Sequence, residues 1–174
     1  MGHGNSVYRE LVHVPLLFHR VGEPGRRIDE QVGIVDLGPT LLDLMRLPPL
    51  DGSMGRSLAR VVEDLDPAPE PRTLYLERRP HNEERDLGWR PGEMFGLQEG
   101  TQKLFFLSTG EVELYDHASD PLETLNLFDA ENRAHRDLLR KAQDTLELFE
   151  AQQKRLVLNG ELVGVEALKK FGYL

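Results

Sequence analysis

The sequence predicts a mixed α/β chain, in which short helices and one buried strand come first and a small antiparallel sheet with a long helix follows. Three observations predict it. Val14–Phe18 is a continuous apolar run, typical of a strand that is buried on both faces. After residue 72, apolar residues alternate in short segments that are separated by glycine turns. Residues 130–154 carry apolar side chains at helical spacing.

The first elements of the chain are short. Ser6 suits the cap of a helix over Val7–Leu11, and Glu10 lies near the reciprocal capping position. The strand at Val14–Phe18 follows, and Gly22–Gly25 then forms a loop.

A second helix is expected to begin at Asp36, whose side chain suits the N-cap. Pro39 falls in its first turn, where the missing N–H costs little. The apolar face of this helix consists of Leu37, Leu41, Leu44 and Met45. Residues 47–49 end it, and Ser57–Val62 is expected to form another short helix.

The proline-rich residues 66–71 are the best internal boundary, and they divide the chain into residues 1–66 and residues 67–174. Beyond them the pattern predicts four strands in an antiparallel meander, with turns at residues 99–100 and 109–110. The strands are Thr73–Glu77, Met94–Gln98, Lys103–Leu107 and Val112–Tyr115. Residues 81–91 are polar and are expected to form a loop.

The long helix is expected to be capped by Asp129 and to run from Ala130 to Lys154. Its apolar stripe consists of Ala134, Leu138, Ala142, Leu146 and Phe149. A further short helix is expected over Val165–Lys170.

Composition and charge exclude several classes of function. The chain has 174 residues, with 21 Lys and Arg against 30 Asp and Glu, so its net charge is −9. We expect no nucleic-acid partner, because binding phosphates needs clustered basic side chains. The absence of cysteine excludes disulfides, thiolate metal sites and a cysteine nucleophile.

The chain also lacks the patterns of membrane and export segments. No stretch reaches the roughly 18 apolar residues that a membrane helix needs, and the first residues do not resemble a secretory signal. We therefore expect no membrane partner and, for the chain as written, a cytoplasmic location.

Six histidines are the first candidates for chemistry, and no two of them have the spacing of a metal-binding pair on a helix. His13 and His19 flank the predicted strand, and strand ends often carry catalytic groups in open α/β sheets. Both side chains could instead be surface or packing residues, and this interpretation is the favoured one. The basic pairs at residues 26–27 and 78–79 could bind an anion or lie in solvent.

Three carboxylates, those of Asp116, Asp120 and Glu123, cluster around Pro121. They could bind a cation, but the pattern favours turns in which Asp side chains cap the local backbone. The chain holds no G-x-S-x-G, S-x-x-K or phosphate-loop pattern. Composition and spacing therefore define no complete active site.

Five segments, in order along the chain, resemble segments of the sulfatases, which belong to the alkaline phosphatase superfamily. These segments are His3–Leu16, Val35–Leu44, Asp51–Leu58, Leu114–Leu127 and Leu168–Leu174. The second resembles the sulfatase pattern VDLAPTLLDL, and the fourth resembles the long and specific pattern LYDLxxDPxExxNL. The third carries a small insertion at Ser53–Gly55.

The resemblance implies the C-terminal part of an alkaline-phosphatase-like α/β sheet, plus a small antiparallel sheet packed with a long C-terminal helix. Sulfatases use a formylglycine that is made from Cys or Ser in a C/S-x-P-x-R stretch. This chain has no Cys, and its Ser119-Asp120-Pro121 is followed by Leu122-Glu123 rather than by Arg. Formylglycine and calcium are therefore expected only in a full-length sulfatase, and this chain is expected to hold no catalytic residue and no metal ligand.

The resemblance carries one substrate-binding residue over to this chain. His3 stands where the family often has a Lys or His that contacts the sulfate, so it is expected to bind an anionic oxygen. His13 is a weaker candidate for the same pocket. Arg85, Trp89 and Arg90 could form part of a pocket rim or lie on a surface loop.

The expected function is therefore that of the C-terminal part of a sulfuric ester hydrolase, inactive alone. The alternatives are part of a phosphoester or phosphonate hydrolase of the same superfamily, and a non-catalytic interaction module. The expected partner is an N-terminal sulfatase portion, or a second copy that pairs through an exposed sheet edge at Val14–Phe18. Full-length members of the family are often periplasmic or secreted.

Overall fold

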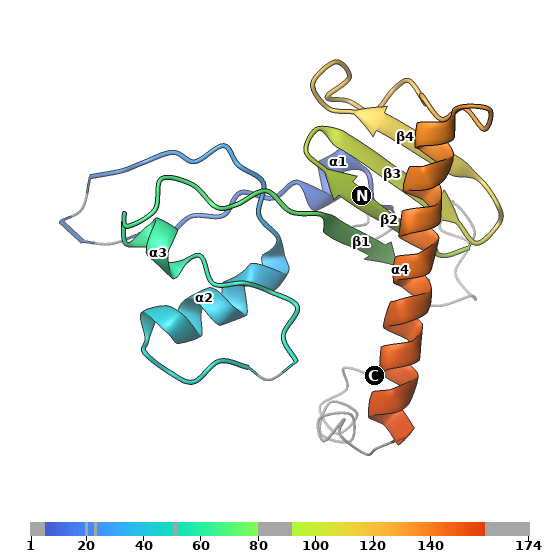
Figure 1. The fold of residues 1–174 in the computed structure, drawn as a ribbon. Coiled ribbons are helices and arrows are strands. Elements are labelled where there is room, and N and C mark those ends of the chain that lie inside the picture. Colours follow the sequence, from blue (N-terminus) through green and yellow to red (C-terminus); the bar gives the residue numbers. More distant parts are fainter. Residues whose placement is uncertain (1–5, 20, 23, 51, 80–91, 159–174) are drawn as a thin grey trace, which may run out of the picture.

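The computed structural model describes residues 6–19, 21–22, 24–50, 52–79 and 92–158, with side chains up to residue 151. It has two parts (Figure 1). The N-terminal lobe, residues 14–66, consists of loops and short helices. The second part is a four-stranded sheet, with a long helix across one face and a short N-terminal helix against the other.

The sheet is an antiparallel meander with the strand order β1-β2-β3-β4. Its strands are β1 (Leu74–Arg78), β2 (Met94–Glu99), β3 (Gln102–Leu107) and β4 (Val112–Asp116). Gly100 and Gly110, in the two hairpin turns, have φ values of +55° and +99°, a region that favours glycine. The four strands and the meander that the sequence predicts are confirmed, with each boundary within one residue.

The two faces of the sheet bury separate apolar clusters, because side chains alternate along each strand. On β3, Phe105 and Leu107 face the N-terminal helix α1 (Arg9–Val12), while Leu104 faces the long helix α4 (Arg133–Leu158). The cluster on the α1 side consists of Val7, Met94, Phe105, Leu107 and Tyr115. The cluster on the α4 side consists of Leu97, Leu104, Leu114 and Ala142.

The long helix is confirmed, but its cap differs from the prediction. Asn132 precedes the helix and its Oδ1 accepts a hydrogen bond from the N–H of Ala134 at 2.9 Å, which is the geometry of an N-cap. Asp129 instead accepts the N–H of Glu131, at 2.8 Å, in the preceding turn. None of the helices in the described part of the chain has the length and apolar character needed to cross a bilayer.

Helix α1 is shorter than the helix predicted over Val7–Leu11. The Oγ of Ser6 accepts the N–H of Tyr8 at 3.2 Å, so it closes a turn before the helix rather than capping it. Val7 is only 1% exposed and belongs to the core of the sheet. The first residues that the structure describes are therefore tied to the sheet and not to the N-terminal lobe.

The N-terminal lobe contains a single 3-10 turn, η1 (Ile34–Asp36), which continues into α2 (Leu37–Leu44), and the short helix α3 (Ala59–Val62). Both predicted helices are present. Asp36 stands at the N-cap position of α2 as predicted, but its backbone is already helical and its carboxylate makes no capping bond to that helix. Its carboxylate is directed to other groups, described below.

The predicted strand at Val14–Phe18 is absent from the structure. A strand needs a neighbour that takes up its N–H and C=O groups, and the described residues supply none beside this segment. The prediction that both faces are buried is therefore wrong in this chain: Val14 is 55% exposed and Leu17 is 83% exposed.

Candidate functional site

Of the substrate-binding residues expected from the sequence, His3 and His13, only His13 lies in the described part of the chain. His3 lies outside the described residues, and so do Arg85, Trp89 and Arg90. His13 is exposed at the C-terminal end of α1. His19 is exposed too, but it lines a hollow in the N-terminal lobe.

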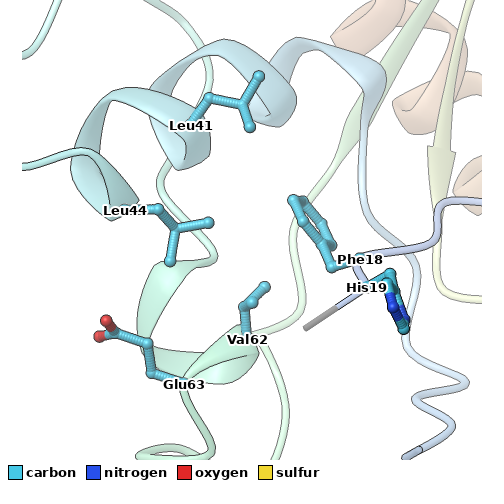
Figure 2. Close-up of a pocket in the computed structure, with 6 residues that line it drawn as sticks. All are labelled: Phe18, His19, Leu41, Leu44, Val62 and Glu63. Carbon is cyan, nitrogen blue, oxygen red and sulfur yellow. The ribbon is translucent and has the colours of Figure 1, made fainter. Parts of the chain in front are cut away.

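This hollow lies between α2, α3 and the segment that carries Phe18 (Figure 2). Its volume is about 360 Å³, and its six lining residues are Phe18, His19, Leu41, Leu44, Val62 and Glu63. Phe18, Leu41, Leu44 and Val62 point into the space between these elements. Four of the six residues are apolar, and Glu63 is paired with Arg46 at 3.1 Å. The hollow therefore suits the docking of apolar groups better than acid–base chemistry.

The surface around the hollow is unusually apolar. Of the sixteen large apolar residues that are exposed in the described part of the chain, twelve lie in the N-terminal lobe. They are Val14, Leu16, Leu17, Val21, Ile34, Val35, Leu41, Met45, Leu47, Leu50, Met54 and Leu65. Exposed apolar side chains are therefore concentrated in this lobe rather than around the sheet.

Asp36 is the polar centre of the lobe, and it is completely buried. One carboxylate oxygen accepts hydrogen bonds from Nη1 of Arg72, at 2.7 Å, and from the backbone N–H of Arg56, at 2.9 Å. The other accepts the backbone N–H of Gly33 at 3.0 Å. Because Arg72 lies just before β1, Asp36 joins the lobe to the sheet.

A second set of hydrogen bonds, two of which are buried, joins the two sulfatase-like segments of the lobe. The Oγ1 of Thr40 donates to the carbonyl of Asp36 at 2.6 Å and accepts the N–H of Leu58 at 2.9 Å. The hydroxyl of Ser57 donates to Asp43 at 2.6 Å. The polar residues of these segments therefore hold the local fold together.

The carboxylates of Asp116 and Asp120 cap turns, as the sequence favours. Asp116 Oδ1 accepts the N–H of Ala118 at 3.0 Å, and Asp120 Oδ2 accepts those of Thr124 and Leu125 at 2.7 and 2.8 Å. These backbone bonds, foremost that from Leu125, hold the pKa of Asp120 below its ordinary value. No group of three or more His, Asp or Glu side chains in the described ranges is arranged to hold a metal ion.

Asn126 covers the free edge of β4. Its Oδ1 accepts the N–H of Leu114 at 3.0 Å, and its Nδ2 donates to the carbonyl of Val112 at 3.0 Å. The N–H of Leu127 adds a bond to the carbonyl of Leu114 at 2.8 Å. The segment therefore replaces a neighbouring strand and protects the edge from pairing with other chains.

Glu123, the third carboxylate of the predicted cluster, has a role that sequence reasoning misses. Its Oε1 accepts bonds from Nζ of Lys103, at 2.7 Å, and Nε2 of His117, at 2.6 Å, and its Oε2 accepts the backbone N–H of Arg9 at 2.7 Å. The side chains of Glu123 and Lys103 are fully buried. No local pattern predicts a buried lysine twenty residues away from its partner, although Glu123 stands in the long sulfatase-like pattern.

Burial and ion pairing have opposite effects on the pKa values of Glu123 and Lys103. Burial raises the pKa of Glu123, but the bonds from Lys103, Arg9 and His117 outweigh it, so the pKa lies below the ordinary 4.5. Burial lowers the pKa of Lys103 below the ordinary 10.5, although the ion pair with Glu123 acts to raise it. The carboxylate therefore stays ionised to a lower pH than that of an ordinary glutamate.

Comparison with known sequences gives one family. Residues 4–152 match the family described as N-sulphoglucosamine sulphohydrolase, C-terminal. No curated protein sequence gives a significant match.

Solved structures resemble this chain over most of its length. BT4656, solved in complex with its substrate D-glucosamine-2-N,6-O-disulfate, is 21% identical with a TM-score of 0.54, and the match covers 67% of this chain and 24% of that one. BT1596, a 2-O GAG sulfatase, is 22% identical with a TM-score of 0.52, covering 71% and 26%. The phosphonate monoester hydrolase of Agrobacterium radiobacter is 24% identical with a TM-score of 0.51, covering 73% and 26%. The chain thus spans about a quarter of the length of these structures.

Proposed function

Because the chain belongs to the sulfatase family, as a C-terminal portion of the N-sulphoglucosamine sulphohydrolase type, we propose that it forms part of a sulfuric ester hydrolase. The nucleophile and the metal ligands of this enzyme come from an N-terminal sulfatase portion. The single observation that carries the proposal is the family match, which extends over residues 4–152 and describes a C-terminal region. The resemblance of five segments in family order supports it.

The apolar surface of the N-terminal lobe supports an N-terminal portion as the partner. The lobe exposes twelve large apolar side chains, among them Leu17 at 83% and Ile34 at 75%. Burying such surface stabilises association by roughly 25 cal/mol per Å². The solved structures of similar fold contain about three quarters of their chain outside the matching part, and a portion of that size has the surface to cover the lobe.

Calcium does not fit the carboxylates that the structure describes. Asp36, Asp116 and Asp120 each use their oxygens on backbone or side-chain donors within the chain, and no described cluster suits a metal ion. We therefore assign calcium and formylglycine to the N-terminal portion. His3 is the residue of this chain proposed to contact the anionic group of the substrate, with His13 as the weaker candidate.

A phosphoester or phosphonate hydrolase is the second candidate function. It is favoured by one observation, the similar fold of a phosphonate monoester hydrolase at 24% identity. A non-catalytic interaction module is the third candidate, for which the apolar lobe would be the binding surface.

The proposal is tested by measuring ester hydrolysis by the chain alone and by the chain joined to the polypeptide that is encoded directly upstream. Each protein is given an aryl sulfate and, separately, an aryl phosphonate monoester. We expect the joined protein to hydrolyse the sulfate and the chain alone to hydrolyse neither ester. Preference of the joined protein for the phosphonate would support the second candidate, and turnover by the chain alone would refute the division of roles.

A further inference from the structure

Two buried carboxylates hold the N-terminal segment Val7–Val12 against the sheet. Glu113 accepts the hydroxyl of Tyr8 at 2.8 Å and that of Tyr115 at 2.6 Å. Glu123 accepts the backbone N–H of Arg9 at 2.7 Å. The ring of Tyr8 also lies edge-on to that of Phe105, with centroids 5.4 Å apart.

The arrangement around Glu123 is costly. Its φ of +54° lies in the left-handed region, which is unfavourable for any residue with a side chain. It also requires Lys103 to be fully buried, and a buried ion pair often contributes little net stability. A strained residue and a buried pair persist where they fix one arrangement among several. Here the strain and the ion pair place Oε2 of Glu123 within hydrogen-bonding distance of the backbone N–H of Arg9.

We propose that Glu123 is a positioning residue: it fixes Arg9, and with it Val7–Val12, at one place on the sheet. It thereby sets the path of this segment over the sheet. The role of that path in catalysis rests on the function proposed above, whereas the positioning itself does not. The long pattern at Leu114–Leu127 would then serve the N-terminal segment as well as its own turns.

Proline at residue 9 has no N–H, and its Cδ stands where that hydrogen lay, so Oε2 of Glu123 must move away while Oε1 can keep its bonds to Lys103 and His117. Arg9 is the first residue of α1, a position where proline is well tolerated. Tyr8 before it has φ −63° and ψ 154°, an extended conformation that suits a residue preceding proline. Arg9→Pro therefore deletes the positioning bond, and Arg9→Ala is its matched control, since it removes the same side chain and keeps the N–H.

The first measurement is amide hydrogen exchange in the 174-residue chain. We expect the amides of Leu11 and Val12, which bond to the carbonyl of Tyr8, to exchange about tenfold faster in Arg9→Pro than in Arg9→Ala. The amide of Leu104 in the sheet is expected to exchange equally in both variants. Equal exchange of the α1 amides in the two variants would overturn the proposal, and loss of protection at Leu104 in Arg9→Pro alone would overturn it too, since the bond would then support the sheet.

The second measurement is the pKa of Glu123 in each variant, by NMR of its carboxyl group. The titratable side chains bonded to it are Lys103 on β3 and His117 after β4, and the charges of Arg9 and Glu10 on α1 act on Lys103. The N–H of Arg9 helps to lower this pKa. We therefore expect the pKa of Glu123 to be higher in Arg9→Pro than in Arg9→Ala, which keeps the N–H. An unchanged pKa would contradict the contact.

In the joined protein, Arg9→Pro is expected to lower kcat/KM for the aryl sulfate about tenfold relative to Arg9→Ala. Equal kcat/KM values in the two variants would refute the link between the path of the chain and catalysis. If the joined protein hydrolyses neither ester, the proposed function fails, and hydrogen exchange and the pKa still decide the positioning role.

Discussion

Replacing Asp36 by Asn tests whether Asp36 is the buried polar centre of the N-terminal lobe. The substitution keeps the shape of the side chain and removes its charge. Two of the three bonds that Asp36 accepts come from the backbone N–H groups of Gly33 and Arg56, and the third comes from Arg72. An amide has only one oxygen, so its NH2 group would face at least one of these donors.

The expected loss of stability follows from burial. Breaking a fully buried ion pair costs about 3–5 kcal/mol, because one charge is left without a partner. Asp36 is fully buried, but the side chain of Arg72 is 20% exposed, so water can solvate part of its charge. We therefore expect a loss of about 2–4 kcal/mol. With a urea dependence of about 2 kcal/mol per M, the unfolding midpoint would fall by about 1–2 M.

The assay is urea unfolding followed by far-ultraviolet circular dichroism. Asp29→Asn is the control, because Asp29 forms an ion pair with Arg27 in which both side chains are largely exposed, at 76% and 87%. Exposed ion pairs contribute little to stability, so the urea midpoint of Asp29→Asn should stay within about 0.5 M of that of the unsubstituted protein. A fall of the same size in both variants, or no fall in Asp36→Asn, would refute the assignment of Asp36 as the buried centre of the lobe.

Two further substitutions test the sheet. Gly96→Ala should cost about 1–3 kcal/mol in thermal unfolding, because its Cβ would lie 2.5 Å from Cβ of Phe105 and no flexible group can give way; an unchanged melting temperature would show that β2 and β3 are further apart. Leu97→Ala should cost about 2–5 kcal/mol by leaving a cavity under α4, whereas Leu148→Ala, at a position 55% exposed, should cost far less. Similar losses in the two leucine variants would mean that α4 does not cover the sheet as described.

The antiparallel sheet could be predicted because its signals are local. Gly100 and Gly110 mark the hairpin turns, and each strand is a segment of five or six residues that contains several apolar side chains. The long helix could be predicted for the same reason. Its exact start could not, since both Asp129 and Asn132 suit a cap and only the geometry of the turn decides between them.

The predictions that failed depend on groups far away in the chain. Val14–Phe18 has the composition of a buried strand, but a strand needs a neighbour, and none of the described residues pairs with it. Asp36 suits an N-cap from its position alone, and only the approach of Arg72, thirty-six residues later, makes it a buried ion-pair partner. The pairing of Lys103 with Glu123 escapes sequence reasoning in the same way.

Whether this chain works with an N-terminal sulfatase portion can be decided by the size of the polypeptide that carries this sequence in its source cell. An antibody against residues 168–174 can precipitate it, and a denaturing gel with peptide sequencing then identifies the bands. The account predicts either a band much larger than 19.8 kDa with a C/S-x-P-x-R stretch upstream, or a separate polypeptide with that stretch in the precipitate. A band at 19.8 kDa with no such polypeptide would contradict it.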